Sequence, residues 1–497
     1  MLGKMTGKEQ QIKNSFIFLL PTITSSLFFL ISTPIFTRIL NKEDYGVLAL
    51  AQVYAIFLSG LANFGMTAAY ERNYFQFRNN PKETAQLLYS SLLFVMVNFT
   101  ILAGITYIFR ESISKIIIGS DGHGNLLFWS CCALFLTSIS YYYLSYFINS
   151  ERAKDVVFYT IVGSIVNLLF SLFMVAYLRI GVIGIVFAQL CSGVVIFCML
   201  SYKFVKTIKP SLSKKIFIES LKISYPLTPR VFLSAIDTQF DKYMVAHLAS
   251  IGGAGIYSIG QKIASGVFTY MSSIENVFSP QVYKRMFDLQ DKGAEPIGKY
   301  LTPFAYSSIF LALIVAIFSE EIIFILTPAP YHGAKDIIAI LAMFYGLMFF
   351  GKINSRQLIF MKKTHMTSLL TMIRIVINVG LNIIFIKKWG AIGAAWGVLV
   401  AGLISNLNFF FVSHHYYKIK WEYKKIGAIY LIFFCSSILI LLLRNALIGY
   451  EIRVIAKSIC LASYIYLGVK LEIISMENYL VIKQMLPIRR IIFLKRK

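Results

Sequence analysis

Charged residues are scarce in this sequence. Asp, Glu, Lys and Arg make up 14% of its 497 residues, whereas soluble domains carry about 25%. Hydrophobic residues make up 57%, and the mean hydropathy is +0.69. A soluble core of that size would have too few polar residues to cover it. The composition therefore excludes an ordinary soluble domain and predicts a chain that faces lipid.

Acidic residues are also few, 23 against 48 Lys and Arg, which gives a formal net charge of +25. In a soluble chain that excess would indicate nucleic-acid binding. Here, with the N-terminus placed inside, the predicted inner loops and tails carry roughly three times as many Lys and Arg as the outer loops, as the positive-inside rule requires. We therefore expect no nucleic-acid partner, contact with membrane lipids, both termini in the cytoplasm and the 203–221 loop inside.

Cysteine and histidine are too few and too dispersed for a metal or disulfide framework. All six cysteines lie inside apolar runs, where they serve as small packing residues. The six histidines show no metal-ligand spacing, and adjacent His414 and His415 fit the end of a helix at the membrane interface. The sequence predicts no metal or cofactor.

Long apolar runs recur along the chain. About 20 apolar residues in a helix cross a hydrocarbon layer of about 30 Å. The first run is too long for a signal peptide and has no small-residue cleavage site, so we expect it to remain as a helix. The runs predict about fourteen membrane helices, at 14–37, 46–69, 86–109, 127–149, 156–178, 181–202, 222–247, 253–276, 300–319, 336–358, 366–386, 391–413, 426–443 and 453–469.

The two halves of the sequence repeat one another weakly. GVIGIVFAQLCSG at 181–193 matches GAIGAAWGVLVAG at 390–402, and GVLALAQVYA at 46–55 matches GIYSIGQKIA at 255–264, both at an offset of 209 positions. An offset of 211 aligns Thr160, Asn167 and Ser171 with Thr371, Asn378 and Asn382. An even number of helices separates the repeats, so both halves have the same orientation.

The repeat predicts an all-α membrane protein with two six-helix lobes, related by a pseudo-two-fold axis along the membrane normal, and two additional C-terminal helices. We expect the first lobe at 1–208, the second at 209–414, and the additional helices with a basic cytoplasmic tail at 415–497. Repeated lobes around a midplane cavity indicate transport by alternating access.

Three predicted spans of the second half carry polar stripes with charges. A charged residue at mid-span costs roughly 2.5–3.5 kcal/mol, so it usually faces a cavity or a partner. Residues three or four apart share one helix face. The stripes are Arg230, Ser234, Asp237 and Asp241; Ser258, Lys262, Ser265, Thr269 and Ser272; and Thr367, Thr371, Arg374, Asn378 and Asn382. The equivalent first-half stripe, Thr160, Ser164, Asn167 and Ser171, is uncharged, so we expect a cavity that is cationic on the second lobe.

Each charge has a functional and a structural interpretation. Arg374 has no acid in its own helix, and guanidinium groups bind phosphate oxygens in pairs, so we expect it to contact an anion in the cavity that Lys262 also lines. Lys262 could instead extend to the membrane surface. Arg230 could neutralise Asp237, and Pro226 and Pro229 should break the inner end of that helix. Asp237 and Asp241 lie one turn apart and could couple transport to protons or sodium.

Two motifs resemble a known family. TRILNKEDYG at 37–46 resembles the T-R-x-L-x-x-x-[ED]-[DE]-[YF]-G signature of polysaccharide exporters, and NVGLNIIFIKKWGAIGAAWG at 378–397 resembles their late-helix signature. The chain is thus similar, over about 14–413, to Wzx-type flippases of the MOP (multidrug, oligosaccharidyl-lipid and polysaccharide) exporter superfamily. Within these motifs we expect Arg38 and Asp44 to cap and pair across the helix junction, and glycines 46, 390 and 393 to form structural positions, the last two by close helix packing.

The resemblance implies a function. Such proteins transfer an undecaprenyl-diphosphate-linked oligosaccharide from the inner to the outer leaflet of the bacterial inner membrane, for surface polysaccharides such as lipopolysaccharide O-antigen. Arg230, Lys262, Arg374, Asn378 and Asn382 are then candidate substrate contacts. A polysaccharide polymerase and a chain-length regulator become candidate partners.

Two other functions stay open at this point. A cation-coupled drug exporter of the same superfamily would need an acid-lined cavity. A membrane oligosaccharide polymerase or ligase would need a large external loop with Arg and His, whereas the longest external loops here, 110–126 and 320–335, are short. We therefore expect a transporter and not an enzyme.

Overall fold

The computed structural model describes residues 20–474 apart from 151, 290–293 and 447, and this part of the chain consists of helices and their connections. Ten helices in it are long and apolar enough to cross a membrane. One of them, α16 (Thr364–Tyr416), bends at Gly390 into two arms. With both arms, and with α2, α11 and α12, the predicted total of about fourteen crossings is reached.

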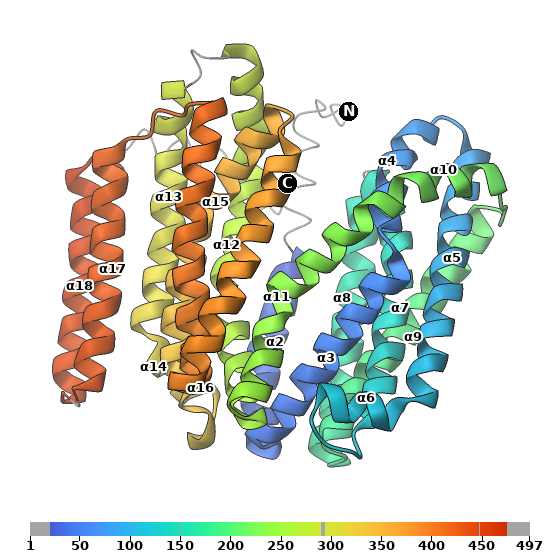
Figure 1. Cartoon of the computed structure of the whole chain (residues 1–497), viewed down its shortest axis with the longest axis horizontal. Coiled ribbons are helices and arrows are strands. Elements are labelled where there is room, and N and C mark those ends of the chain that lie inside the picture. The colour runs from blue at the N-terminus through green and yellow to red at the C-terminus, as the bar shows by residue number, and fades with distance from the viewer. Residues whose placement is uncertain (1–19, 151, 290–293, 447, 475–497) are drawn as a thin grey trace, which may run out of the picture.

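The first lobe is the right-hand bundle in Figure 1. Three of its connections contain short helices, α4, α6 and the π-helical turn η1. α10 packs against α4 and α5, and Asn73 of α4 donates a buried hydrogen bond of 3.0 Å to Ser220 of α10. Its elements are α2 (Leu20–Ile39), α3 (Lys42–Asn63), α4 (Met66–Phe77), α5 (Pro81–Ile108), α6 (Arg110–Ile117), α7 (Gly124–Asn149), α8 (Ala153–Ser171), η1 (Leu172–Tyr177), α9 (Val182–Thr207) and α10 (Lys214–Ser224).

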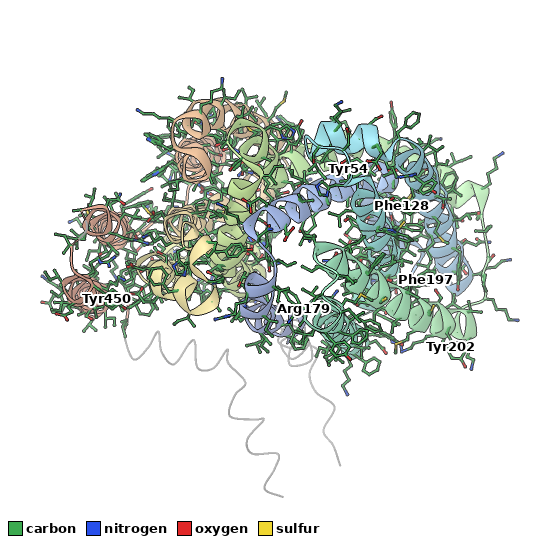
Figure 2. All side chains as sticks on the ribbon, turned by 90° about the horizontal axis from the view of Figure 1, so that it is seen from below. Tyr54, Phe128, Arg179, Phe197, Tyr202 and Tyr450 are labelled. Atoms are coloured by element: carbon green, nitrogen blue, oxygen red, sulfur yellow. The ribbon has the colours of Figure 1, made fainter. Side chains whose placement is uncertain are left out.

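The second lobe and the C-terminal hairpin form the left-hand bundle of Figure 1, with the hairpin α17–α18 outermost. Figure 2 places Tyr450 of α18 and Tyr202 of α9 at opposite ends of the long axis. The elements are η2 (Tyr225–Leu227), α11 (Thr228–Leu248), α12 (Ile251–Leu289), α13 (Ala294–Ile317), α14 (Ser319–Leu326), η4 (Ala329–Tyr331), α15 (Ala334–Phe360), α16, α17 (Tyr423–Asn445) and α18 (Tyr450–Lys470).

The lobes meet where α3 crosses α12, and the contact obeys the predicted two-fold symmetry. A Cβ atom added to Gly46 would lie 2.0 Å from the Ile251 carbonyl oxygen, and one added to Gly255 would lie 2.0 Å from the Lys42 carbonyl oxygen. Gly46 corresponds to Gly255, and Lys42 to Ile251, at the offset of 209 positions. The two contacts are therefore equivalent, as a two-fold interface requires. The internal repeat therefore predicted the symmetry correctly.

This crossing lies at one end of the molecule, which we call the α6–α14 end. Tyr331 of the second lobe donates a 2.7 Å hydrogen bond to the carbonyl of Leu40 in the first, and His247 Nε2 lies 3.2 Å from the carbonyl oxygen of Ile116. In Figure 1 the lobes converge here and diverge toward the opposite, α4–α10 end. The α6–α14 end is therefore closed.

The repeated glycines serve two different purposes. Gly181 and Gly390, 209 positions apart, both adopt positive φ, 71° and 59°. The nearest heavy atom to a Cβ on Gly390 would be 4.0 Å away, so the prediction that this glycine permits close packing is wrong: the backbone conformation requires it. At Gly393 a Cβ would lie 2.0 Å from the carbonyl oxygen of Phe385, so there the two arms of α16 do pack closely.

The first motif forms the α2–α3 junction. Asn41 caps α3, accepting a 2.7 Å hydrogen bond from the Asp44 amide, while its own amide donates to the Asp44 carboxylate at 3.0 Å. This reciprocal cap matches the capping role predicted for Asp44. The predicted pairing of Arg38 with Asp44 is wrong, because Arg38 donates instead to the carbonyl of Pro34 in its own helix.

The hairpin α17–α18 is fixed to the second lobe by buried ion pairs. Arg453 binds the Glu320 carboxylate at 2.8 and 2.7 Å, Lys457 binds Glu321 at 2.5 Å, and Arg444 lies 3.4 Å from Asp336. The charges were visible in the sequence, but their partners lie more than one hundred positions away. Removing one member would leave a buried charge uncompensated, so these pairs hold the hairpin in place.

Candidate functional site

One face of α3 lines two cavities in succession. Tyr45, Leu48, Ala49 and Gln52 line the first, and Ile56, Ser59, Gly60 and Asn63 line the second. These positions follow the three- and four-residue spacing of one helix face. The face is continuous from the closed α6–α14 end toward the α4–α10 end.

The first of these, the central cavity, has a volume of about 490 Å³ and lies between α2, α3, α7, α8 and α9 of the first lobe and α12 of the second. Hydroxyl and amide groups dominate its polar lining. They include the whole uncharged stripe of α8, namely Thr160, Ser164, Asn167 and Ser171, together with Gln52 and Gln189.

Within the ranges that the structure describes, Lys262 is the one charged side chain that lines the central cavity. It comes from α12 of the second lobe, and its Nζ lies 5.6 Å from the ring centroid of Phe29 on α2 of the first. An ammonium on an aromatic face is attracted by the ring and retains donors for an anion. The cavity is therefore polar and cationic at a single point.

A separate cavity of about 180 Å³ lies inside the second lobe, between α11, α12, α15 and α16. Arg374 forms an ion pair with Asp237 at its edge. Asp241, which is 5% exposed, accepts hydrogen bonds from Asn378 at 2.9 Å and Asn382 at 2.7 Å. We call this the second-lobe cavity.

The Asp241 site has unused oxygen atoms. Tyr257 donates a third, longer hydrogen bond to Asp241 at 3.3 Å. Within the described part of the chain no hydrogen-bond partner faces the buried Oδ1 atoms of Asn378 and Asn382. A carboxylate and two amide oxygens within a few ångströms are the donor set that a hard cation prefers.

The two cavities are equivalent by the internal repeat. Gln52 lines the central cavity and Gln261 the second-lobe cavity, 209 positions apart. At the same offset, Ser32 in the first corresponds to Asp241 in the second. Each half thus has its own copy of one pocket, and among the described lining residues only the second-lobe copy carries carboxylates.

The predicted substrate residues do not form one site. The prediction that Arg374 and Lys262 share a cavity is wrong, because neighbouring Gln261 and Lys262 of α12 face different cavities. Arg374 has a carboxylate partner in Asp237 of another helix, and its contact with a substrate anion stays a prediction. Arg230 lies in the first turn of α11, and its side chain is outside the described part.

Two groups of polar residues went unrecognised in the sequence. Glu275 of α12 binds Lys352 and Arg356 of α15, each at 2.6 Å. Ser59, Asn63, Thr67 and Glu71, spaced four apart, line the second cavity along α3 and α4. That spacing was a readable signal, but the run lies among polar residues at a helix end and did not stand out.

The sequence model of the family described as "Polysaccharide biosynthesis protein" matches residues 12–281. No curated protein matches the chain.

Solved structures resemble the fold. The lipid II flippase MurJ, in an inward closed conformation, has a TM-score of 0.68 at 17% identity, covering 92% of this chain and 99% of that one. An inward-facing multidrug resistance MATE family transporter of the MOP superfamily has 0.60 at 15%, covering 84% and 96%. A MOP superfamily transporter from Pyrococcus furiosus has 0.57 at 15%, covering 82% and 95%. At these identities the likeness establishes the fold alone.

Proposed function

The chain belongs to the family of polysaccharide biosynthesis proteins and has the fold of MOP superfamily transporters, and from this premise we propose that it moves an undecaprenyl-diphosphate-linked oligosaccharide from the inner to the outer leaflet. The observation that carries the proposal is the central cavity, whose described lining has hydroxyl and amide groups and one cation, Lys262. A diphosphate needs the cation, and a glycan needs the hydroxyl and amide groups.

Transport follows from rocking of the two lobes, during which the α3–α12 crossing at the α6–α14 end closes and separates in turn. With the α6–α14 end closed, substrate enters the central cavity from the α4–α10 end. Separation of the lobes at Gly46 and Gly255 then exposes the cavity to the other side. Lys262 reaches across the lobe boundary to Phe29, so bound diphosphate would contact both lobes.

A cation-coupled drug exporter is the less suitable function. Such a protein would hold cationic amphiphiles with carboxylates in its central cavity, and the described residues that line this one include none. The carboxylates Asp237 and Asp241 lie in the second-lobe cavity and are already bound by Arg374 and by amides.

The cellular test is depletion of the protein in its own host. We expect lipid-linked oligosaccharide to accumulate in the membrane with its glycan inaccessible to an external lectin, while surface polysaccharide decreases. If depletion instead leaves surface polysaccharide intact, or unlinked sugar precursors accumulate, the substrate is a different one.

The sidedness of the molecule gives a first prediction. From the excess of Lys and Arg we expect the α4–α10 end in the cytoplasm. In a cysteine-free background, Asp121→Cys at the α6–α14 end should react with an impermeant thiol reagent added to intact cells, and Lys215→Cys on α10 should react only after the membrane is opened. Both positions are exposed, so each can react when it faces the reagent. Reaction of Lys215→Cys in intact cells would show that the orientation is the opposite of the predicted one.

The second prediction concerns Asp241. We propose that its carboxylate, with the Oδ1 atoms of Asn378 and Asn382, binds the coupling cation or proton when the amides rotate toward it. Asp241→Asn keeps the size and removes the charge, so transport should lose its dependence on the ion gradient and decrease about tenfold, with normal protein yield. The measurement is surface polysaccharide formation with proton or sodium gradients collapsed.

Two further variants serve as controls for that experiment. Asp288→Asn, on an exposed position of α12, should leave transport unchanged. Asp237→Asn leaves Arg374 without its partner and should lower the yield of folded protein. Normal, gradient-dependent transport by Asp241→Asn would reduce Asp241 to a structural role.

A further inference from the structure

The second cavity along α3 is not explained by a diphosphate site. It has a volume of about 640 Å³ and lies between α3, α4 and α11, so both lobes line it. We call it the α3–α11 cavity. Its polar lining consists of Ser59, Asn63, Thr67, Glu71, Ser234 and Thr238.

The backbone itself opens this cavity. α3 ends at Asn63 because Phe64 and Gly65 both adopt left-handed conformations, with φ of 52° and 75°. Broken backbone at a membrane protein's interior is tolerated where it lines a water-filled space. Thr228 at the start of α11 donates a 3.2 Å hydrogen bond to the freed carbonyl of Phe64, which brings the second lobe to the break.

Among the lining residues whose side chains the structure describes, Glu71 is the one that carries a charge, and it is a carboxylate. Tyr141 donates to its Oε1 at 3.2 Å, which orients the group. A carboxylate offers about four acceptor positions, so the remaining ones are available to a ligand. This site would accept hydroxyl or ammonium donors and would repel a second carboxylate.

The cavity also lies at a suitable distance from the diphosphate site. Gln52 of the central cavity and Asn63 of the α3–α11 cavity are eleven residues apart on the same face of α3, about 16 Å along the axis at 1.5 Å per residue. A glycan attached to a diphosphate at Lys262 would extend along this face toward the α4–α10 end.

We propose that the α3–α11 cavity binds a neutral or amino sugar unit of the glycan, that Glu71 accepts hydrogen bonds from it, and that the site discriminates against uronic acids. The inference rests on the proposed flippase function and adds the class of sugar that the protein selects.

The test is equilibrium binding to the purified full-length protein in lipid nanodiscs. Three probes are used: undecaprenyl diphosphate alone, the same carrier with a neutral trisaccharide, and the same carrier with a trisaccharide ending in a uronic acid. The wild type should bind the neutral glycolipid most tightly. Glu71→Gln should weaken that binding about tenfold, leave the unglycosylated carrier unaffected and improve binding of the uronic acid probe.

Glu71→Gln and a control variant, Glu219→Gln, separate an effect on binding from an effect on folding. Glutamine retains the acceptor for Tyr141, and Glu219→Gln, a carboxylate on α10 at the same end but outside the lining, should bind all three probes like the wild type. If the wild type binds the three probes equally, or Glu71→Gln weakens all of them alike, the sugar site is refuted. If the wild type binds none of them, the proposed flippase function is refuted instead.

Discussion

Replacing Gly255 by alanine is expected to decrease transport and to hold the protein open at the α6–α14 end. The added methyl group would lie 2.0 Å from the carbonyl oxygen of Lys42 and 2.8 Å from the amide nitrogen of Gly46. Both are backbone atoms of α3, so no side-chain rotation relieves the overlap. The two helices, and with them the two lobes, must separate.

The size of the effect follows from the cost of overpacking. An extra methyl group in a close contact costs about 1–3 kcal/mol, which shifts a two-state equilibrium roughly 5- to 150-fold. Closure of this end is the step that the variant opposes. Transport should therefore decrease by a similar factor, while folding is retained because each lobe keeps its own core.

The measurement combines transport with thiol labelling. A cysteine at Gln52, inside the central cavity, should become accessible from outside in the Gly255→Ala background. Gly266→Ala is the matched control, since it lies in the same helix and its Cβ would meet nothing within 4 Å. Equal transport and equal labelling in the two variants would show that the crossing is not the point where the lobes separate.

The second large effect is expected at Lys262. In the described part of the chain its ammonium group is the sole charge lining the central cavity, so a bound diphosphate would depend on it. A hydrogen bond to a charged group contributes about 1.5–3 kcal/mol, so Lys262→Ala should decrease transport roughly 10- to 150-fold. Lys262→Arg should retain most activity, because a guanidinium also binds phosphate oxygens.

The check is surface polysaccharide per molecule of membrane-inserted protein. Lys284→Ala, an exposed lysine farther along α12, removes the same charge outside the cavity and should behave as the wild type. Full activity of Lys262→Ala at normal expression would contradict the proposal that the diphosphate binds in the central cavity.

The fold was predictable because its determinants are regular along the chain. Apolar runs of membrane-crossing length fix the helices, and the 209-position repeat correctly relates Gly46 to Gly255. The proline signal was also reliable: Pro226 lies in the turn η2 and Pro229 in the first turn of α11. Both inferences depend only on spacing and local backbone chemistry.

The site was less predictable because its contacts join distant helices. Arg374 and Asp237 are 137 positions apart, and helical periodicity carries no information about which helix faces which. The same limit applies to Gln261 and Lys262, adjacent residues that line different cavities. The sequence predicted that the α8 stripe is polar and uncharged, and therefore favoured the charged stripes of the second lobe as the substrate site. The α8 stripe in fact lines the central cavity.

Reconstitution tests the central claim most directly. The purified protein is incorporated into vesicles with undecaprenyl-diphosphate-linked oligosaccharide, and the fraction of glycan accessible to an external lectin or glycosidase is followed over time. We expect glycan to cross the membrane with the wild-type protein and with Gly266→Ala. With Lys262→Ala and Gly255→Ala it should cross much more slowly. If all four proteins are correctly folded and glycan crosses at the same rate with each of them as in protein-free vesicles, the proposed flippase function is contradicted.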